Sequence, residues 1–346
     1  MDLRSAFDPP VSTIVLATGE FGKPGGKTAN GVVMHSELFE ANAVVDPETA
    51  GNTADVVLGR SDVKPIPVVE SMEEALEQVP DAEALVIGVA PAGGALPEPW
   101  IEDIQTAMHA GCDVVSGLHV FLSERESWTS LAEETGSRLF DVRQPPGEDE
   151  LRVGDGSIDG LDADVVLTLG TDCAIGKRTT TFELYRAARE AGINAGWVAT
   201  GQTGIMVGAH RGVVIDRVPA DFTAGVVEDL VAAVAKDHDL VFVEGQACLT
   251  HRAYSGVTLS ILHGSWPDTV VVADDPDRER RTHFEQWSVA EFEDEIAAIE
   301  LLSDATVAAV STWGDEDTRD RYDLPAANVY TEEGPAELLA AVQKHL

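Results

Sequence analysis

A glycine-bounded loop that ends in Gly-Lys constrains the fold of this chain more than any other segment. The loop runs from Gly170 to Lys177 (GTDCAIGK), between an apolar strand-like run at 165–169 and a helix predicted over 177–190. Strand, glycine loop and helix in this order are typical of a phosphate-binding P-loop. Backbone N–H groups of such a loop point into one concavity, and the helix dipole favours an anion there. The sequence therefore predicts a site for a phosphorylated ligand.

The loop departs from a magnesium-nucleotide P-loop at the residue after the lysine. A P-loop that binds Mg-nucleotide carries Ser or Thr at that position, and the hydroxyl group binds Mg²⁺. Arg178 takes this position, and Thr179 and Thr180 follow too late on the helix to face the same way. The spacing also differs, because five residues separate Gly170 from Gly176. We therefore expect a phosphorylated cofactor that is held without a metal ion.

The cofactor-binding segment is predicted to span the loop and the first helical turn. Its residues are Gly170, Thr171, Asp172, Cys173, Ala174, Ile175, Gly176, Lys177, Arg178, Thr179 and Thr180. Cys173 lies near a helix N-terminus, where the pKa of a thiol tends to fall. This residue is either a nucleophile or a small side chain that fits the loop.

The charge of the chain limits its partners. The 346 residues include 61 Asp and Glu but 23 Lys and Arg, which gives a formal charge of −38. A surface this acidic disfavours nucleic acid and anionic membranes, so the expected partner is a small-molecule substrate. The acids are scattered, which favours adaptation to high salt and a halophilic cytoplasm. Three cysteines without a C-x-x-C pattern, and no long apolar run, predict a soluble protein without disulfides or structural zinc.

Strand-like and helix-like segments alternate along the chain, which predicts a parallel α/β fold. Residues 1–145 are predicted to form a Rossmann-like domain. Within it, glycines at 19–28 form either a second anion pocket or a tight turn, and a strand-end loop follows at 90–94. A segment rich in Pro, Gly and Asp predicts a linker over 146–160. Residues 161–346 contain the P-loop and are predicted to form a P-loop NTPase-like domain with a parallel sheet.

Functional side chains are expected where strands of the second domain end, because ligands of open α/β sheets bind at the carboxyl ends of strands. The apolar run at 240–243 leads into Glu244, which resembles a Walker B acid. An earlier glycine loop carries Gln202 and Thr203. Glu244 is the first candidate for a general base and His263 the second. The alternatives are a solvated glutamate and a histidine with a structural hydrogen bond.

A donor-rich segment further along the chain predicts a site for a carboxylate substrate. Arg252 is the candidate for clamping a carboxylate in a bidentate pair. Asp221 is either a helix N-cap or a substrate contact. No spacing typical of a metal site occurs, so no metal ligands are predicted. The predicted substrate-binding residues are Gln202, Thr203, Asp221, Gln246, His251, Arg252, Tyr254 and Ser255.

With these motifs assembled, the chain resembles a P-loop family formerly of unknown function, one branch of which is D-glutamate N-acetyltransferase. The resemblance covers nearly the whole chain and implies a Rossmann-like N-terminal domain followed by a P-loop domain. It also implies an acetyl-CoA-dependent N-acetyltransferase that acts on an acidic amino acid, with D-glutamate as the first candidate substrate. The segments that carry it are GTDCAIGK at 170–177, ATGQTGI at 199–205, VEGQ at 243–246 and HRAYSGVTLSILHG at 251–264, with a looser match at 27–31 and Asp46.

Two other functions stay open. The loop, together with Gln202-Thr203-Gly204 and Glu244-Gly245, also resembles dethiobiotin synthetase, although Arg178 stands where that enzyme has Thr. Turnover of ATP that depends on Mg²⁺ would indicate such a ligase or a kinase. Tight binding without turnover would indicate a non-catalytic nucleotide or CoA sensor. The default expectation for assembly is a homodimer.

Overall fold

The computed structural model describes residues 2–89, 96–314 and 316–346. The chain forms two compact units, Met1–Pro145 with Gln202–Ala209 and Pro146–Gly201 with His210–Leu346. Among the described residues, no helix has the length and apolar character needed to cross a bilayer. The strand-end loop predicted at 90–94 lies outside the described residues.

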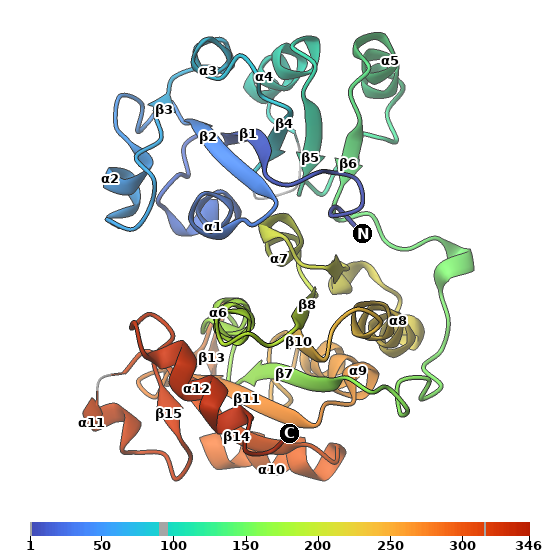
Figure 1. The fold of residues 1–346 in the computed structure, drawn as a ribbon, viewed down its shortest axis with the longest axis vertical. Helices are drawn as coiled ribbons and strands as arrows, with labels where there is room; N and C mark the ends of the chain where they lie inside the picture. The colour runs from blue at the N-terminus through green and yellow to red at the C-terminus, as the bar shows by residue number, and fades with distance from the viewer. Residues whose placement is uncertain (1, 90–95, 315) are drawn as a thin grey trace. The chain divides into compact units, whose positions relative to one another are not determined.

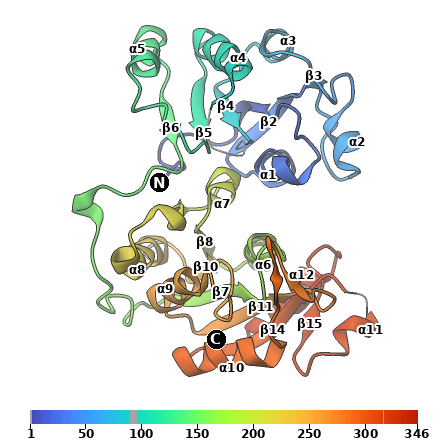
Figure 2. The same ribbon diagram turned by 180° about the vertical axis from the view of Figure 1, so that it is seen from behind.

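The first unit is built on a six-stranded parallel sheet with the order β3-β2-β1-β4-β5-β6, which can be followed in Figures 1 and 2. Its strands are apolar and buried, as parallel strands covered on both faces are. This order is that of a Rossmann fold, so the fold predicted for the N-terminal domain is confirmed. The strands are β1 (Val11–Leu16), β2 (Phe39–Val45), β3 (Val68–Val69), β4 (Ala84–Ile87), β5 (Asp113–Ser116) and β6 (Leu139–Asp141). The helices are α1 (Lys27–His35), α2 (Ala54–Leu58), α3 (Met72–Gln78), α4 (Glu98–His109), α5 (Glu126–Thr135) and α7 (Gln202–Val207).

The glycines after β1 form the tight turn. Gly19 and Gly22 have φ angles of +77° and +76°. The carboxylate of Asp46, at the end of β2, accepts the N–H of Gly19 at 2.8 Å and that of Phe21 at 3.3 Å. Asp46 therefore holds the turn in place through its own carboxylate oxygens.

The second unit is built on a seven-stranded parallel sheet with the order β15-β14-β11-β7-β10-β8-β9. Helix α6 packs against α12, and α8 packs against α9. The predicted strand and helix around the glycine loop are present as β7 and α6, which confirms the P-loop domain. The strands are β7 (Asp164–Gly170), β8 (Ala195–Ala199), β9 (Arg211–Gly212), β10 (Leu240–Glu244), β11 (Thr269–Asp274), β14 (Thr306–Thr312) and β15 (Ala326–Ala327), with a separate hairpin of β12 (Arg280–Arg281) and β13 (Phe284–Ser288). The helices are α6 (Lys177–Glu190), α8 (Thr223–Ala235), α9 (Ser255–Ser265), α10 (Phe292–Leu302), α11 (Glu316–Arg319) and α12 (Gly334–Val342).

Helix α7 joins the first unit although it lies between β8 and β9 in the chain. The Thr203 hydroxyl lies 2.7 Å from the hydroxyl of Thr28 in α1. The amide of Glu37 donates to the carbonyl of Val207 at 3.0 Å. Local sequence patterns did not indicate this, because the contacts join residues about 170 positions apart.

The segment predicted as a linker is bound to the second unit. The Arg152 guanidinium pairs with Glu228 of α8 at 2.7 Å and with Asp229 at 2.9 Å. Gly225 allows a close approach here, because a Cβ at that position would lie 2.1 Å from the carbonyl oxygen of Arg152. Arg152, within the segment predicted as a linker, is therefore anchored on α8.

Candidate functional site

The loop between β7 and α6 is shaped by two residues with left-handed backbone. Gly176, the N-cap of α6, has φ +93°, and Ala174 has φ +53°. A Cβ on Gly176 would also lie 3.1 Å from the indole nitrogen of Trp313, at the end of β14. Glycine is thus required at Gly176 for its conformation and for the packing of Trp313 against the loop.

Lys177 curls back over the loop. Its side chain is buried, and its ammonium donates to the backbone carbonyl of Asp172. Burial lowers the pKa of the Lys177 ammonium, and nearby thiols and acids only partly oppose that effect. A ligand phosphate at the loop would offer this ammonium a charged acceptor in place of a carbonyl.

The threonines of α6 are engaged in structure. The Thr180 hydroxyl lies 2.7 Å from the hydroxyl of Ser311 in β14. Thr181 donates to the carbonyl of Lys177 at 2.9 Å, and Thr179 is half-buried. Thr180 is therefore not placed to supply the hydroxyl that a Mg-nucleotide site needs directly after the lysine.

Glu244 ends β10 at the carboxyl edge of the sheet, as predicted. It pairs in register with Thr168 of β7, and its side chain is buried. The carboxylate accepts the N–H of Thr200 at 3.1 Å, and the Thr200 hydroxyl donates to the Glu244 carbonyl at 2.7 Å. Gln246 donates to the same hydroxyl at 2.9 Å, so Glu244 and Gln246 are held on one residue at the end of β8.

Arg178 lies within electrostatic range of Glu244. Burial lowers the pKa of the Arg178 guanidinium, while the charges of Glu244 and Tyr330 act in the opposite direction. Arg178 thus takes the sequence position of the metal ligand in a Mg-nucleotide P-loop, and its charge interacts with that of the Walker B-like acid.

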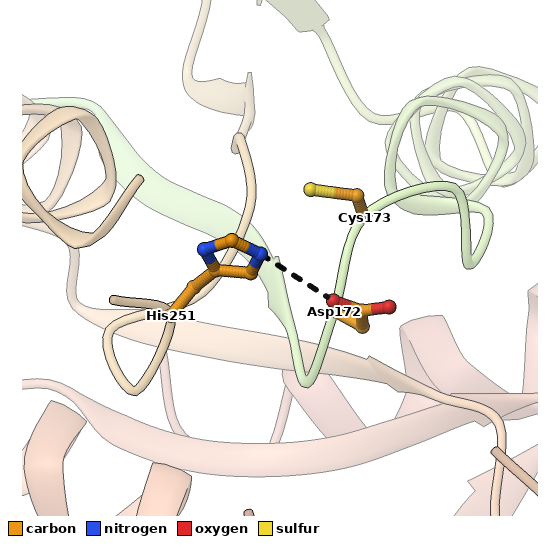
Figure 3. A group of neighbouring side chains, drawn as sticks. All are labelled: Asp172, Cys173 and His251. Carbon is orange, nitrogen blue, oxygen red and sulfur yellow. Dashed lines mark ion pairs between the residues drawn. The ribbon is translucent and has the colours of Figure 1, made fainter. Parts of the chain in front are cut away.

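Three side chains of the loop and of a neighbouring segment form a cluster, shown in Figure 3. Asp172 and Cys173 come from the loop, and His251 comes from the segment before α9. The His251 Nε2 lies 4.0 Å from Oδ1 of Asp172, and both side chains are fully buried. The nitrogen, sulfur and oxygen atoms of the three side chains lie within 4.8 Å of one another.

Two arginines, Arg281 in β12 and Arg278 just before it, place positive charge beside Asp172 of this cluster. Arg281 lies 3.6 Å from Oδ1 of Asp172, and Arg278 lies 3.6 Å from its Oδ2. The amide of Thr282 donates to Oδ2 at 2.8 Å. Burial alone would raise the pKa of Asp172, but the hydrogen bonds from Thr282 and Cys173 and the charge of Arg281 outweigh it and lower that pKa. Asp172 is therefore ionised at neutral pH.

Neither arginine was predicted as a site residue. Arg281 also donates to the carbonyl of Thr171 and to the Cys248 sulfur, each at 2.8 Å. The available signal was the run DRERR at 277–281, a basic cluster in a very acidic chain. Its approach to the loop could not be read from the sequence, because more than 100 residues separate Arg281 from Asp172.

Asp, Cys and His are ligand types of zinc, but their surroundings do not suit a metal ion. The amide of Ala253 donates to Nδ1 of His251 at 3.2 Å, which places the ring proton on Nε2, the atom that faces Asp172. A zinc-bound histidine normally donates from its second nitrogen. Arg278 and Arg281 already neutralise Asp172. The donor set thus favours hydrogen bonding over metal binding.

The other predicted substrate residues near the loop differ in exposure. Tyr254 is exposed and stacks on His251, with ring centroids 4.8 Å apart. Arg252 is exposed and lies over the ring of Trp287 at 4.9 Å. Ser255, half-buried, begins α9. His251 is fully buried, because Tyr254 stacks on its ring and Phe284 and Trp287 of the hairpin contact it edge-on.

Two predicted residues lie away from the loop. His263 is eight residues from Ser255 in the same helix, about 12 Å along its axis, and its Nε2 lies 3.1 Å from the carbonyl of Leu302. His263 and the exposed Asp221 line a separate hollow of about 390 Å³ with residues of the segment before β7. The structure therefore does not bring His263 or Asp221 to Glu244. Gln202 and Thr203 belong to the first unit.

Comparison with known proteins follows the same two-part division. Residues 152–339 match a domain of unknown function described as the P-loop domain of DUF1611, and residues 47–145 match its Rossmann-like N-terminal domain. The chain belongs to the DUF1611 family. The P-loop, Glu244, His251 and both arginines of the hairpin all fall within the P-loop domain of this DUF1611 protein.

A solved structure and two curated proteins are similar to this DUF1611 chain. A DUF1611 family protein from Anabaena variabilis has a TM-score of 0.86 and 31% identity, over 96% of this chain and 99% of that one. A D-glutamate N-acetyltransferase of Tritonibacter scottomollicae is 36% identical over 65% of each chain. One of Pseudoalteromonas sp is 38% identical over 55% of this chain and 56% of that protein. The matched region thus spans less than two thirds of either curated relative.

Proposed function

We propose that this protein is an N-acetyltransferase that transfers the acetyl group of acetyl-CoA to the amino group of an acidic amino acid, D-glutamate first. The observation that carries the proposal is the 36% and 38% identity to two proteins named D-glutamate N-acetyltransferase. The P-loop supplies the physical basis for the cofactor. Coenzyme A carries a pyrophosphate and a 3′-phosphate, which loop N–H groups and a helix N-terminus bind well.

The charge near the loop supports CoA in this role. Lys177 and Arg178 come at the end of the loop, and Arg278 and Arg281 lie beside it, paired with Asp172. These cations gather in one region of a chain with a net charge of −38. Lys177 and Arg178 offset part of the charge of the phosphates, in a chain that otherwise repels anions.

Arg178 favours this reading over the Mg-ATP ligase or kinase. Arg178 replaces the residue whose hydroxyl binds Mg²⁺ in a ligase, and its positive charge interacts with that of Glu244, the Walker B-like acid. A phosphorylated cofactor that reacts at its thioester needs no metal at its phosphates. A non-catalytic sensor would bind the same cofactor, so only the measurement of turnover distinguishes it from the proposed acetyltransferase.

Glu244 is the proposed general base for the amine of the substrate. The amine must lose a proton before or during attack on the thioester, and the Glu244 carboxylate lies at the carboxyl edge of the sheet beside Gly201. Arg252 is the proposed clamp for a substrate carboxylate, because its guanidinium is exposed and positioned over Trp287. Gln246, Tyr254 and Ser255 are the proposed further contacts.

The experiment that tests the proposal follows the formation of N-acetylglutamate from acetyl-CoA and D-glutamate in molar KCl. We expect the wild-type protein to form product and Lys177→Ala to bind acetyl-CoA at least about 10-fold more weakly, the scale of one lost charged hydrogen bond. Lys344→Ala, at an exposed position, is the matched control and should bind as the wild type does. Equal affinity of Lys177→Ala and the wild type would contradict the P-loop role.

A further inference from the structure

Cys173 is the least buried residue of the cluster with Asp172 and His251. Asp172 and His251 are fully buried, whereas Cys173 is only half-buried. Its sulfur lies within 4.8 Å of both the Asp172 carboxylate and a ring nitrogen of His251, and Figure 3 shows the three side chains grouped together.

Two buried polar atoms of the cluster have no hydrogen-bond partner among the described residues. They are Oδ1 of Asp172 and Nε2 of His251, one an acceptor and the other a donor. A buried polar atom without a partner costs about 1–3 kcal/mol, so such pairs are rare unless they serve a ligand or a reaction. Here the donor and the acceptor both lie beside the same thiol.

We propose that Cys173 carries the acetyl group between acetyl-CoA and the amine, an inference that rests on the proposed function. In the first half-reaction the Cys173 sulfur attacks the thioester carbonyl and the C–S bond to CoA breaks. The Cys173 thiol gives its proton to solvent as the thiolate forms, and the departing CoA sulfur takes up a proton from solvent. In the second half-reaction the amine attacks the Cys173 thioester, and the sulfur leaves with a proton as the thiol. No oxidant or further reactant is needed.

The neighbouring groups have matching roles. The Nε2–H of His251 faces Oδ1 of Asp172, and a ring nitrogen of His251 lies within 4.8 Å of the sulfur, close enough to stabilise negative charge that develops there. His251 is therefore a positioning and charge-stabilising residue rather than the base. Burial raises the pKa of the Cys173 thiol, and Lys177, Arg281 and Arg278 oppose that rise. Because the thiolate is the nucleophile, the acetylation of Cys173 should become faster as pH rises above neutral.

The test detects the acetyl group on Cys173 directly. The full-length protein is incubated with acetyl-CoA in molar KCl without an amino acid, quenched in acid, digested and analysed by mass spectrometry. We expect one acetyl group on the peptide that contains Cys173. Neutral hydroxylamine should release it, as it releases a thioester, and addition of D-glutamate should remove it. Cys112→Ser should keep the acetyl group, because Cys112 is buried in the first unit. Cys173→Ala should lower turnover by at least about 100-fold.

Each other outcome decides between the two proposals. The carrier role of Cys173 is contradicted if the wild type forms N-acetylglutamate but carries no acetyl group on Cys173. It is also contradicted if the turnover of Cys173→Ala stays within about twofold of the wild type. In either case the acetyl group passes directly from acetyl-CoA to the amine. An acetyl group on Cys173 without turnover of D-glutamate supports the carrier and contradicts the proposed acceptor. The absence of both adduct and product overturns both proposals. The adduct test on wild-type protein does not depend on the folding of any variant.

Discussion

The Nε2 of His251 faces Oδ1 of Asp172 across 4.0 Å, with both side chains fully buried. The Asp172 carboxylate also balances two positive charges beside the P-loop, because Arg281 and Arg278 each lie 3.6 Å from one of its oxygens. One carboxylate thus joins the loop, the hairpin and the segment before α9. The stability of the second unit and the chemistry at Cys173 therefore depend on the same residue.

Removing this carboxylate should destabilise the protein strongly. Asp172→Ala leaves Arg281, which is 3% exposed, without its ionic partner. We expect a loss of about 3–5 kcal/mol in the free energy of unfolding, because an uncompensated buried charge remains. Urea unfolding in high salt measures it. Asp277→Asn is the control, since the Arg321–Asp277 pair is exposed and should be worth under about 1 kcal/mol. Equal effects of the two substitutions would show that the buried pair is not structural.

Much of this arrangement was predictable, and the part that was not has a physical reason. The strand, loop and helix around Lys177 follow from local apolar runs and glycines, and the strand-end position of Glu244 follows from the apolar run before it. The hairpin that brings Arg281 to Asp172 is fixed by contacts across more than 100 residues. His263 looked functional by residue type alone, but it lies near the far end of α9 from Ser255, where its ring contacts a backbone carbonyl.

Gly176→Ala should weaken both stability and ligand binding. A Cβ there meets a left-handed φ of +93° and lies 3.1 Å from Trp313. Gly192→Ala separates the two causes, because Gly192 has φ +81° and nothing within 4 Å of its Cβ position. We expect Gly192→Ala to cost about 1–2 kcal/mol from the backbone alone. Gly176→Ala should cost more than that and also lower the affinity for acetyl-CoA. Thermal unfolding and titration with acetyl-CoA measure the two effects, and equal losses in stability would contradict the role of Trp313.

Arg178→Thr should introduce a dependence on magnesium. The substitution removes a cation whose charge interacts with that of Glu244, and it restores the hydroxyl that binds Mg²⁺ in a P-loop. We expect the wild type to bind acetyl-CoA equally with Mg²⁺ and with a chelator. The variant should bind acetyl-CoA more weakly and bind ATP better when Mg²⁺ is present. Arg186→Thr, on the exposed face of α6, is the control and should behave as the wild type does. Binding of acetyl-CoA by the wild type that requires Mg²⁺ would contradict a metal-free site.

The stability of the protein should fall on mild acidification because of His251. Burial and the charge of Arg281 lower the pKa of His251 in the folded protein. Between that value and the unfolded pKa of about 6.5, the unfolded chain binds the extra proton, so stability rises with pH and is lost below about pH 6.5. His251→Gln should flatten this dependence, whereas His345→Gln, at an exposed position, should leave it unchanged. Urea midpoints across this range measure the slope. A slope that persists in His251→Gln would assign the titration to another group.

Thiol release from acetyl-CoA, followed in molar KCl with D-glutamate or L-glutamate, without ATP and with a metal chelator present, tests the central claim most directly. The account predicts release that requires D-glutamate and continues in the chelator. Absence of release with either amino acid, together with phosphate release from ATP that requires Mg²⁺, would contradict it and identify the P-loop as a nucleotide site.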